Sequence, residues 1–195
     1  MKKTVTNRAA QSRVLRIIGG TWRGRRLRFP AQDEIRPTPD RVRETLFNWL
    51  GPRVVGARCL DLFAGSGALG LEALSRGAAQ VTFVERDGVA VRELRARLTE
   101  WGAVGGQVEH MDAVRFLGSP AQPFEIVFLD PPFASGLLPQ VATLLQDEHW
   151  LSASALVYVE TGADSGLPAL PATWKVTRTK QAGAVGYHLL TGGDA

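Results

Sequence analysis

Residues 130–133, Asp-Pro-Pro-Phe, follow an apolar run over residues 124–129 that is typical of a buried parallel strand. Proline has no backbone N–H for a sheet ladder, so the two prolines must lie at or beyond the end of this strand. A carboxylate held in such a stiff turn can accept hydrogen bonds from a polar substrate group, and the ring of Phe133 can stack on a flat one. The simplest alternative is a strand terminator, because Asp-Pro pairs often begin turns.

A second pattern, Gly65-x-Gly67-x-x-Gly70, lies between an expected strand and an expected helix. This spacing matches the dinucleotide-binding fingerprint, and Glu85 follows about 20 residues later, where a ribose-binding acid belongs. A nicotinamide-dependent oxidoreductase is therefore one hypothesis. The pattern is weak by itself, since glycines also serve plain tight turns.

Asp61 favours a different cofactor, because it precedes the glycines and points an acid at their loop. A carboxylate repels a pyrophosphate and attracts an ammonium group. S-adenosylmethionine carries an ammonium and a sulfonium and has no phosphate. Glu85 can then accept from the ribose hydroxyls and Asp112 from the adenine amino group, all at the carboxyl ends of neighbouring strands. The alternative for Asp61 is a buried acid that caps the turn.

The surrounding pattern alternates strands and helices with short links, which predicts an α/β fold with a mostly parallel sheet and helices on both faces. Before it, Asp40 is predicted to cap a helix that ends at Gly51. The last two strands are predicted to form an antiparallel hairpin at the sheet edge. The expected strands are 58–64, 80–85, 107–111, 124–129, 155–160, 174–180 and 185–190, and the expected helices are 67–76, 89–101, 113–117 and 137–145.

The first 30 residues carry nine Lys or Arg and no acid, so the other 14 of the 23 bases face all 19 acids. A segment of one charge sign usually binds phosphate. The stretch "RVLRIIGGTWRGRRLRFP" alternates apolar and basic residues around Gly-Gly, which predicts a β-hairpin rather than a disordered tail or a transit peptide. Trp22 is predicted to pack this hairpin rather than to stack on nucleic acid. The arginines predicted to bind nucleic acid are Arg8, Arg13, Arg16, Arg23, Arg25, Arg26 and Arg28.

Composition excludes several classes of protein. A single cysteine, Cys59, cannot form an internal disulfide or a cysteine-cluster zinc site, and the three histidines show no ligand spacing, so we expect no metal. No apolar stretch is long enough for a signal peptide or a membrane span, so we expect a cytoplasmic protein with no membrane partner. We also expect a monomer, although no residue pattern fixes the oligomeric state.

From residue 36 onward the chain resembles the class I S-adenosylmethionine-dependent methyltransferases. "DLFAGSG" corresponds to their first motif, and "DPPF" to the motif of amino-group methyltransferases. With "RIIGGTWRGRRL", "RPTPDRVRETLFNWL" and the terminal "KQAGAVGYHLL", the chain is similar along nearly its whole length to the bacterial guanine-N2 methyltransferases of small-subunit (16S) ribosomal RNA. The resemblance implies a Rossmann-like fold with a seven-stranded sheet over residues 36–195, and a basic RNA-binding extension over residues 1–35. It also implies S-adenosylmethionine as cofactor and 16S ribosomal RNA as partner, free or within an assembling small ribosomal subunit.

The resemblance assigns catalysis to Asp130, Pro131, Pro132 and Phe133. The carboxylate and the Pro131 carbonyl would both accept from the exocyclic amine and aim its lone pair at the methyl group, while Phe133 stacks on the base. Prolines fix this geometry before the substrate arrives. The predicted cofactor-binding residues are Arg36, Thr38, Asp61, Phe63, Gly65, Gly67, Glu85, Arg86, Asp112 and Ala113.

Three alternatives stay open at this point. Asp-Pro-Pro-Phe is shared with adenine and cytosine methyltransferases, so guanine as the target rests on the family resemblance alone. A DNA methyltransferase usually carries a target-recognition insertion, for which this chain has no room. A non-catalytic RNA-binding or assembly factor would have no need for the intact motif.

Overall fold

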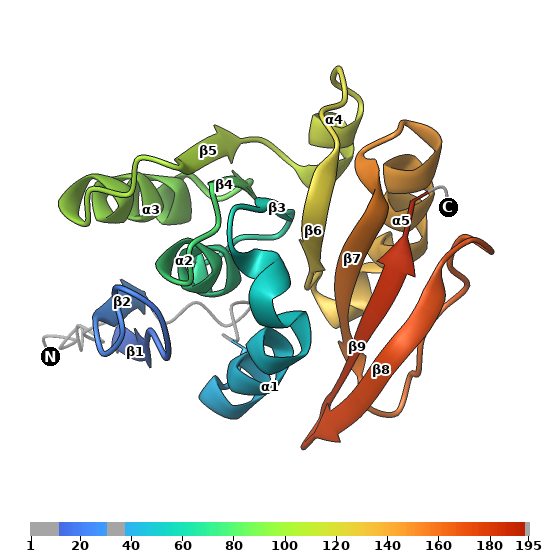
Figure 1. The fold of residues 1–195 in the computed structure, drawn as a ribbon, viewed down its shortest axis with the longest axis horizontal. Helices are drawn as coiled ribbons and strands as arrows, with labels where there is room; N and C mark the ends of the chain where they lie inside the picture. Colours follow the sequence, from blue (N-terminus) through green and yellow to red (C-terminus); the bar gives the residue numbers. More distant parts are fainter. Residues whose placement is uncertain (1–11, 31–37, 194–195) are drawn as a thin grey trace, which may run out of the picture.

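The computed structural model describes residues 12–30 and 38–193, and its centre is a seven-stranded sheet (Figure 1). Five strands are parallel, and the last two pair antiparallel with each other as a hairpin at one edge, which confirms the predicted sheet and its terminal hairpin. In spatial order the strands are β5 (Gly106–His110), β4 (Gln80–Glu85), β3 (Arg58–Asp61), β6 (Phe124–Leu129), β7 (Leu151–Gly162), β9 (Val185–Gly192) and β8 (Lys175–Ala182).

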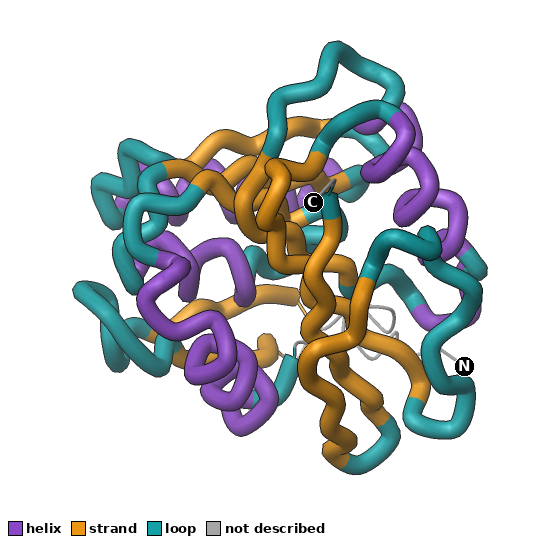
Figure 2. The backbone as a smooth tube through the Cα atoms, turned by 45° about the vertical axis from the view of Figure 1, so that its right-hand side comes forward, coloured by secondary structure: helices purple, strands orange, loops and turns teal. Residues whose placement is uncertain are grey.

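Helices cover both faces of the sheet, as the strand–helix alternation predicts (Figure 2). The side chains of strand β6 are buried on both faces. Ile126 and Phe128 lie in the core formed with one group of three helices, and Val127 and Leu129 lie in the core formed with a second group of two. Successive side chains point to opposite faces, so a strand that is covered twice must be apolar throughout. The first group is α1 (Asp40–Leu50), α2 (Ala68–Ser75) and α3 (Gly88–Glu100), and the second is α4 (Ala113–Leu117) and α5 (Leu137–Asp147).

The order of the strands brings two motifs together. The chain runs from β3 outward through β4 and β5, then crosses back to β6 on the other side of β3. Open α/β sheets bind ligands at such a switch point, outside the carboxyl ends of the strands. Asp61 ends β3 and lies opposite Phe128 of β6, two residues before Asp130. The glycine loop and the Asp-Pro-Pro-Phe turn are therefore neighbours.

The predicted N-terminal hairpin is present as β1 (Ser12–Arg16) and β2 (Arg26–Pro30), which pair antiparallel. Leu15 lies opposite Leu27, and both side chains are buried against the body of the protein. Arg16, next to Leu15, is exposed. The alternation of apolar and basic residues thus gives the hairpin one face toward the core and one toward solvent.

The turn of the hairpin lies tightly against the end of α2. Gly20 has a φ of 76°, and a Cβ on it would lie 1.8 Å from the carbonyl oxygen of Ser75. Only glycine can occupy this place. Trp22 packs against Trp101 at the end of α3, with 5.2 Å between the ring centroids, which confirms its predicted packing role.

A buried carboxylate ties the hairpin to the sheet domain. The side chain of Glu72, on α2, is fully buried and accepts hydrogen bonds of 2.8 Å from the backbone N–H groups of Ile18 and Gly19. The same carboxylate pairs with Arg43 of α1 at 3.3 Å and with Arg76 at 2.8 Å. The hairpin is therefore fixed to the helix that follows the glycine loop.

The structure corrects one predicted helix start. Asp40 does not cap α1, because the N-cap is Pro39, whose φ of −55° and ψ of 148° keep it extended and which makes no side-chain cap. Asp40 is the first helical residue instead, and its carboxylate accepts from Arg43 at 2.6 Å. The helix ends at Gly51, as predicted, with a φ of 54°.

Several strand boundaries also differ from expectation, most clearly at β3 and β7. Strand β3 ends at Asp61 rather than at residue 64, because the apolar residues that follow already turn into the glycine loop. Strand β7 is longer than the expected 155–160, since it pairs with β6 on one side and β9 on the other.

Candidate active site

The glycine loop is shaped by packing. Gly65 and Gly67 have left-handed backbones, with φ of 51° and 77°. A Cβ on Gly67 would lie 2.6 Å from a methyl carbon of Leu94, and one on Gly70 would lie 2.2 Å from the ring of Phe83. These glycines let α2 begin directly after β3 and lie close against β4.

Asp61 is buried below this loop, and its Oδ2 accepts a 2.9 Å hydrogen bond from the N–H of Gly70. The pKa of Asp61 is raised to about 7, mainly by burial; the hydrogen bond from Gly70 opposes this shift, and the charge of Glu85 adds to it. This hydrogen bond agrees with the alternative in which Asp61 is a buried acid that caps the turn. A cation beside the carboxylate would hold it ionised, so the same geometry also suits an ammonium group.

Glu85 and Asp112 lie at the ends of the next two strands, as predicted, and each also organises local backbone. Glu85 accepts at 2.7 Å from the N–H groups of Gly65 and Asp87. Asp112 caps α4 by accepting from the N–H of Arg115 at 2.9 Å. Each carboxylate oxygen can accept more than one hydrogen bond, so these contacts leave capacity for a ligand.

These acids fit S-adenosylmethionine, because carboxylates at the ends of neighbouring strands favour a cation and disfavour a pyrophosphate. The other predicted residues lie in the loops that follow the same strands: Phe63 is half-buried, Ala113 is buried beside Asp112, and Arg86 is exposed at the end of β4. Arg36 lies outside the described residues. Thr38 lies elsewhere, beside Glu160, as described below.

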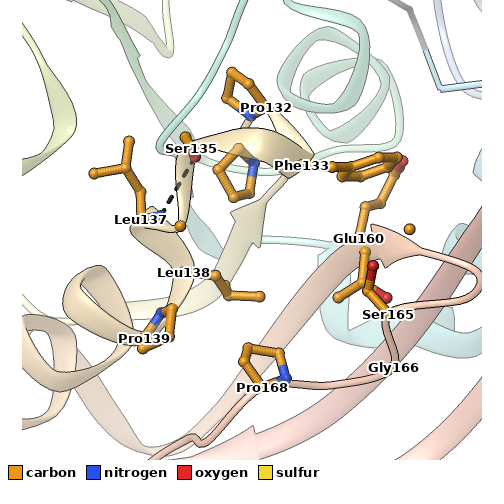
Figure 3. A pocket seen from close by; sticks show the side chains of 14 residues that line it. Pro132, Phe133, Ser135, Leu137, Leu138, Pro139, Glu160, Ser165, Gly166 and Pro168 are labelled. Carbon is orange, nitrogen blue, oxygen red and sulfur yellow. Dashed lines mark hydrogen bonds between the residues drawn. The ribbon is translucent and has the colours of Figure 1, made fainter.

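The Asp-Pro-Pro-Phe turn leaves the sheet at β6 and presents an aromatic ring. Pro131 is buried and Pro132 is exposed, with its carbonyl accepting from the N–H of Ser135 at 2.8 Å. Phe133 begins the short 3₁₀ helix η2 (Phe133–Ser135), and 51% of its surface is exposed (Figure 3). A large exposed ring on a rigid turn is suited to stacking on a flat ligand.

A second carboxylate lies beside this turn. Leu129 pairs with Val159 in the parallel ladder, so the next residues along the two strands, Asp130 and Glu160, are neighbours. Glu160 is 3% exposed, and its Oε1 accepts at 2.8 Å from Thr38 Oγ1 and at 2.8 Å from the Tyr158 hydroxyl. The sequence patterns above do not single out Glu160. The sequence feature that could have identified it is an acid at the end of an apolar strand: Glu160 ends "VYVE" in the same way as Glu85 ends "VTFVE".

The two carboxyl groups influence each other's ionisation. Burial raises the pKa of Asp130 well above its usual range, the charges of Glu160 and Asp61 raise it further, and the nearby Thr38 hydroxyl opposes the shift. Burial also raises the pKa of Glu160, against the hydrogen bonds from Thr38 and Tyr158. Close carboxyl groups cannot both ionise cheaply, so this pair shares a proton over a higher pH range than ordinary acids.

The turn and Glu160 line one cavity of about 200 Å³ (Figure 3). Its walls include Pro131, Pro132 and Phe133 on one side and the loop around Ser165 on the other. Pockets for drug-sized ligands usually span roughly 300–1,000 Å³, so this cavity suits a smaller flat group.

The arginines predicted to bind RNA are partly visible. Arg16, Arg23, Arg25 and Arg26 are exposed on the hairpin. The guanidinium carbon of Arg25 lies 5.3 Å from the centroid of the Trp101 ring. Nη2 of Arg16 lies 3.8 Å from Oδ2 of Asp40. Arg8 lies outside the described residues, as do the side chains of Arg13 and Arg28.

Within residues 12–30 and 38–193, no three His, Cys, Asp or Glu side chains gather where they could hold a metal ion. In the same part of the chain, no helix has the length and apolar character needed to cross a membrane.

Comparison with known proteins decides the family. A family model described as "Conserved hypothetical protein 95" matches residues 15–191. "Ribosomal RNA small subunit methyltransferase D" of Escherichia coli K12 is 52% identical over 175 residues, which cover 90% of this chain and 88% of that protein. The protein of the same name from Haemophilus influenzae is 45% identical over 193 residues, covering 97% and 98%. The chain belongs to this methyltransferase family.

A solved Escherichia coli structure described as a methyltransferase superposes with a TM-score of 0.86 at 48% identity, covering 93% of this chain and 99% of that one. The fold is therefore the class I methyltransferase fold, and the methyl donor is S-adenosylmethionine. The nicotinamide-dependent oxidoreductase considered from the glycine spacing is wrong.

Cofactor binding should stabilise the methyltransferase selectively. S-adenosylmethionine or its demethylated product should raise the melting temperature, by the equivalent of about 2.7 kcal/mol at a hundredfold excess over Kd, whereas NAD should not. Glu85→Ala should reduce this shift, because charge-assisted hydrogen bonds contribute roughly 1.5–3 kcal/mol each. It should also lower the melting temperature of the free protein, since Glu85 holds Gly65 and Asp87. Stabilisation by NAD, or an unchanged shift in the variant, would contradict the assignment.

Cofactor affinity should depend on pH through Asp61. Its pKa of about 7 means that the carboxyl is largely protonated at pH 6, whereas a ligand ammonium prefers the ionised form. The Kd of S-adenosylhomocysteine should therefore fall as pH rises from 5.5 to 7, by at most about one log unit per pH unit. Asp61→Asn should bind more weakly with a flat profile, and the exposed control Glu148→Gln should keep the wild-type slope. Calorimetric titration measures both, and a sloping profile in Asp61→Asn would exclude this role.

Proposed function

We propose that this methyltransferase methylates the exocyclic N2 amine of a guanine in small-subunit (16S) ribosomal RNA. The observation that carries the proposal is the Asp-Pro-Pro-Phe turn, fixed beside the cofactor loop and opening into a cavity with an exposed ring. Ribosomal RNA as substrate is supported by the names of the relatives. Guanine N2 as the target is supported by the resemblance of the sequence motifs to the guanine-N2 methyltransferases.

The amine of guanine is a poor nucleophile, because its lone pair is delocalised into the ring. The bound cofactor supplies an electrophilic methyl group. Asp130 and the carbonyl of Pro131 accept hydrogen bonds from the two N–H groups and so orient the lone pair toward that methyl group. The buried Pro131 holds these acceptors in place before the base arrives, which reduces the entropy lost at the transition state.

The base must reach this cavity unpaired or flipped out of a helix. Phe133 then supplies a stacking surface, since half of its ring is open. After transfer the amine carries an extra proton, and Asp130 is placed to accept it. The raised pKa of Asp130 makes its carboxylate a better proton acceptor than an ordinary aspartate.

A methyl-transfer assay with mapping tests the proposal. Radiolabelled S-adenosylmethionine is supplied with 16S ribosomal RNA, with small-subunit particles lacking the modification, with DNA and with no acceptor. Digestion and mass analysis of the product nucleoside should give N2-methylguanosine from one of the RNA substrates. Methylated adenine or cytosine, or transfer to DNA alone, would refute it.

The hairpin arginines should bind RNA phosphates. The double variant Arg23→Ala, Arg26→Ala should weaken RNA binding and reduce the slope of log K against log salt by about 1.4–1.8, because each neutralised phosphate accounts for roughly 0.7–0.9 of that slope. Arg25 is left unchanged because it packs on Trp101. The control variant, Arg178→Ala with Lys180→Ala on the exposed face of β8, removes the same charge from the far end of the sheet. Fluorescence anisotropy at several salt concentrations measures the slopes, and equal slopes for the two variants would mean that the hairpin only adds net charge.

A further inference from the structure

We infer that Glu160 selects guanine by accepting a hydrogen bond from the N1–H of the target base, beside the amine held by Asp130. This role deepens the proposed function and rests on it. None of the family motifs includes Glu160. Its place in the cavity and the chemistry of the bases point to the role.

The position of Glu160 places it at the edge of a bound base. Asp130 and Glu160 follow paired residues of adjacent parallel strands, so they lie side by side. Glu160 lines the same cavity as Pro131, Pro132 and Phe133, and its side chain points toward the Phe133 ring (Figure 3). A base stacked on that ring would have its edge beside Glu160 and the turn that begins at Asp130.

The hydrogen bonds that hold Glu160 leave one of its oxygens for a ligand. Among the described residues, the hydroxyl groups of Thr38 and Tyr158 both donate to the same oxygen, Oε1. They fix the orientation of the carboxylate and favour its ionised form, while Oε2 retains its capacity to accept from a ligand. A carboxylate that is 3% exposed and held on one oxygen is preorganised for binding on the other.

The amino-bearing bases differ at the ring atom that Glu160 would face. In guanine the ring nitrogen next to the amine, N1, carries a hydrogen and is a donor. In adenine and cytosine the ring nitrogen next to the amine is an acceptor, and its lone pair would face the lone pairs of an ionised Glu160. Guanine offers an N–H donor to each carboxyl group and so favours loss of the proton that the pair otherwise shares. Adenine and cytosine offer a lone pair at the same place and disfavour it, because a buried polar group facing the wrong partner is costly.

The alternative is that Glu160 only supports the fold by holding Thr38 and Tyr158. The two roles are separated by changing the base as well as the residue. In 2,6-diaminopurine the N2 amine is kept, but N1 becomes an acceptor. RNA carrying either guanine or diaminopurine at the mapped target, assembled by ligation, gives a ratio of single-turnover methylation rates for each variant.

The wild-type enzyme should methylate guanine at least about tenfold faster than diaminopurine, the effect expected for one hydrogen bond to a charged group. Glu160→Gln should lower this ratio about tenfold or more, because the amide can donate to the diaminopurine N1. The control Tyr158→Phe removes a hydrogen bond to Glu160 and keeps the carboxylate, so both rates should fall together at a constant ratio.

An unchanged ratio in Glu160→Gln would overturn the inference while leaving guanine-N2 methylation intact. If that variant does not fold, the ratio of the guanine rate to the diaminopurine rate in the wild-type enzyme still tests the inference, since equal rates on the two bases would overturn it. A wild-type enzyme that methylates no guanine at N2 would remove the proposed function itself, and the inference with it.

Discussion

Replacing Asp130 with alanine should lower the single-turnover methylation rate at least about a hundredfold, in the range found for one preorganised polar contact. The reason is that Asp130 accepts from the target amine mainly in the transition state, so its loss falls on turnover more than on binding. Affinities for S-adenosylmethionine and for RNA should stay close to those of the wild type. Asp130→Asn should be milder, because the amide oxygen still accepts a hydrogen bond without the full charge.

The stability of the same variants distinguishes catalysis from a structural role. The pKa of Asp130 is raised in the folded state, so the native protein binds more protons than the unfolded chain between the two pKa values, and stability falls as pH rises through that window. Removing the carboxyl group should therefore leave the melting temperature at pH 8 unchanged or higher. If Asp130 only terminates the strand, its replacement should instead lower the melting temperature. Early melting with a wild-type rate per folded molecule would show that the catalytic assignment is wrong.

Glu72→Ala should cause the largest loss of stability, about 3–5 kcal/mol, as is typical when one partner of a buried ion pair is removed. Both Arg43 and Glu72 have fully buried side chains, and the variant would also leave the N–H groups of Ile18 and Gly19 without their acceptor. Urea unfolding measures the change.

The matched control for Glu72 is Glu100→Ala on α3. Glu100 pairs with Arg97 at 2.8 Å, but its side chain is 61% exposed, so its removal should cost less than about 1 kcal/mol. Comparable losses for the two variants would mean that the buried network contributes no more than a surface pair. A loss of RNA affinity in Glu72→Ala, at temperatures where the sheet domain is still folded, would report release of the hairpin.

The positions of three acids of the site could be predicted from the residues next to them in the sequence. Asp61, Glu85 and Asp130 each end an apolar run, and the rule that ligands bind at the carboxyl ends of parallel strands brings them together. The same reasoning predicted the N-terminal hairpin, because alternation of apolar and basic residues is a local signal.

The contacts between distant segments were not predictable in this way. Thr38 and Glu160 are 122 residues apart and meet because Thr38, just before α1, lies against Glu160 of β7. A charged residue such as Arg43 on an amphipathic helix is expected at the surface, yet its side chain is buried. Its charge is compensated by the ion pair with Glu72 and by a hydrogen bond to the backbone carbonyl of Arg16. Pairing of this kind depends on the tertiary fold, and no periodicity in the sequence reports it.

Gly70 limits what the glycine spacing says about the ligand. The Phe83 ring excludes any side chain at this position whatever ligand is bound, so the glycine is a requirement of helix-on-strand packing. Dinucleotide-binding folds have the same requirement at the third glycine of their fingerprint. The two kinds of protein therefore share this glycine for a reason that lies in the packing of α2 on β4. The charge at the position of Asp61 is what separates a site for a cation from a site for a phosphate.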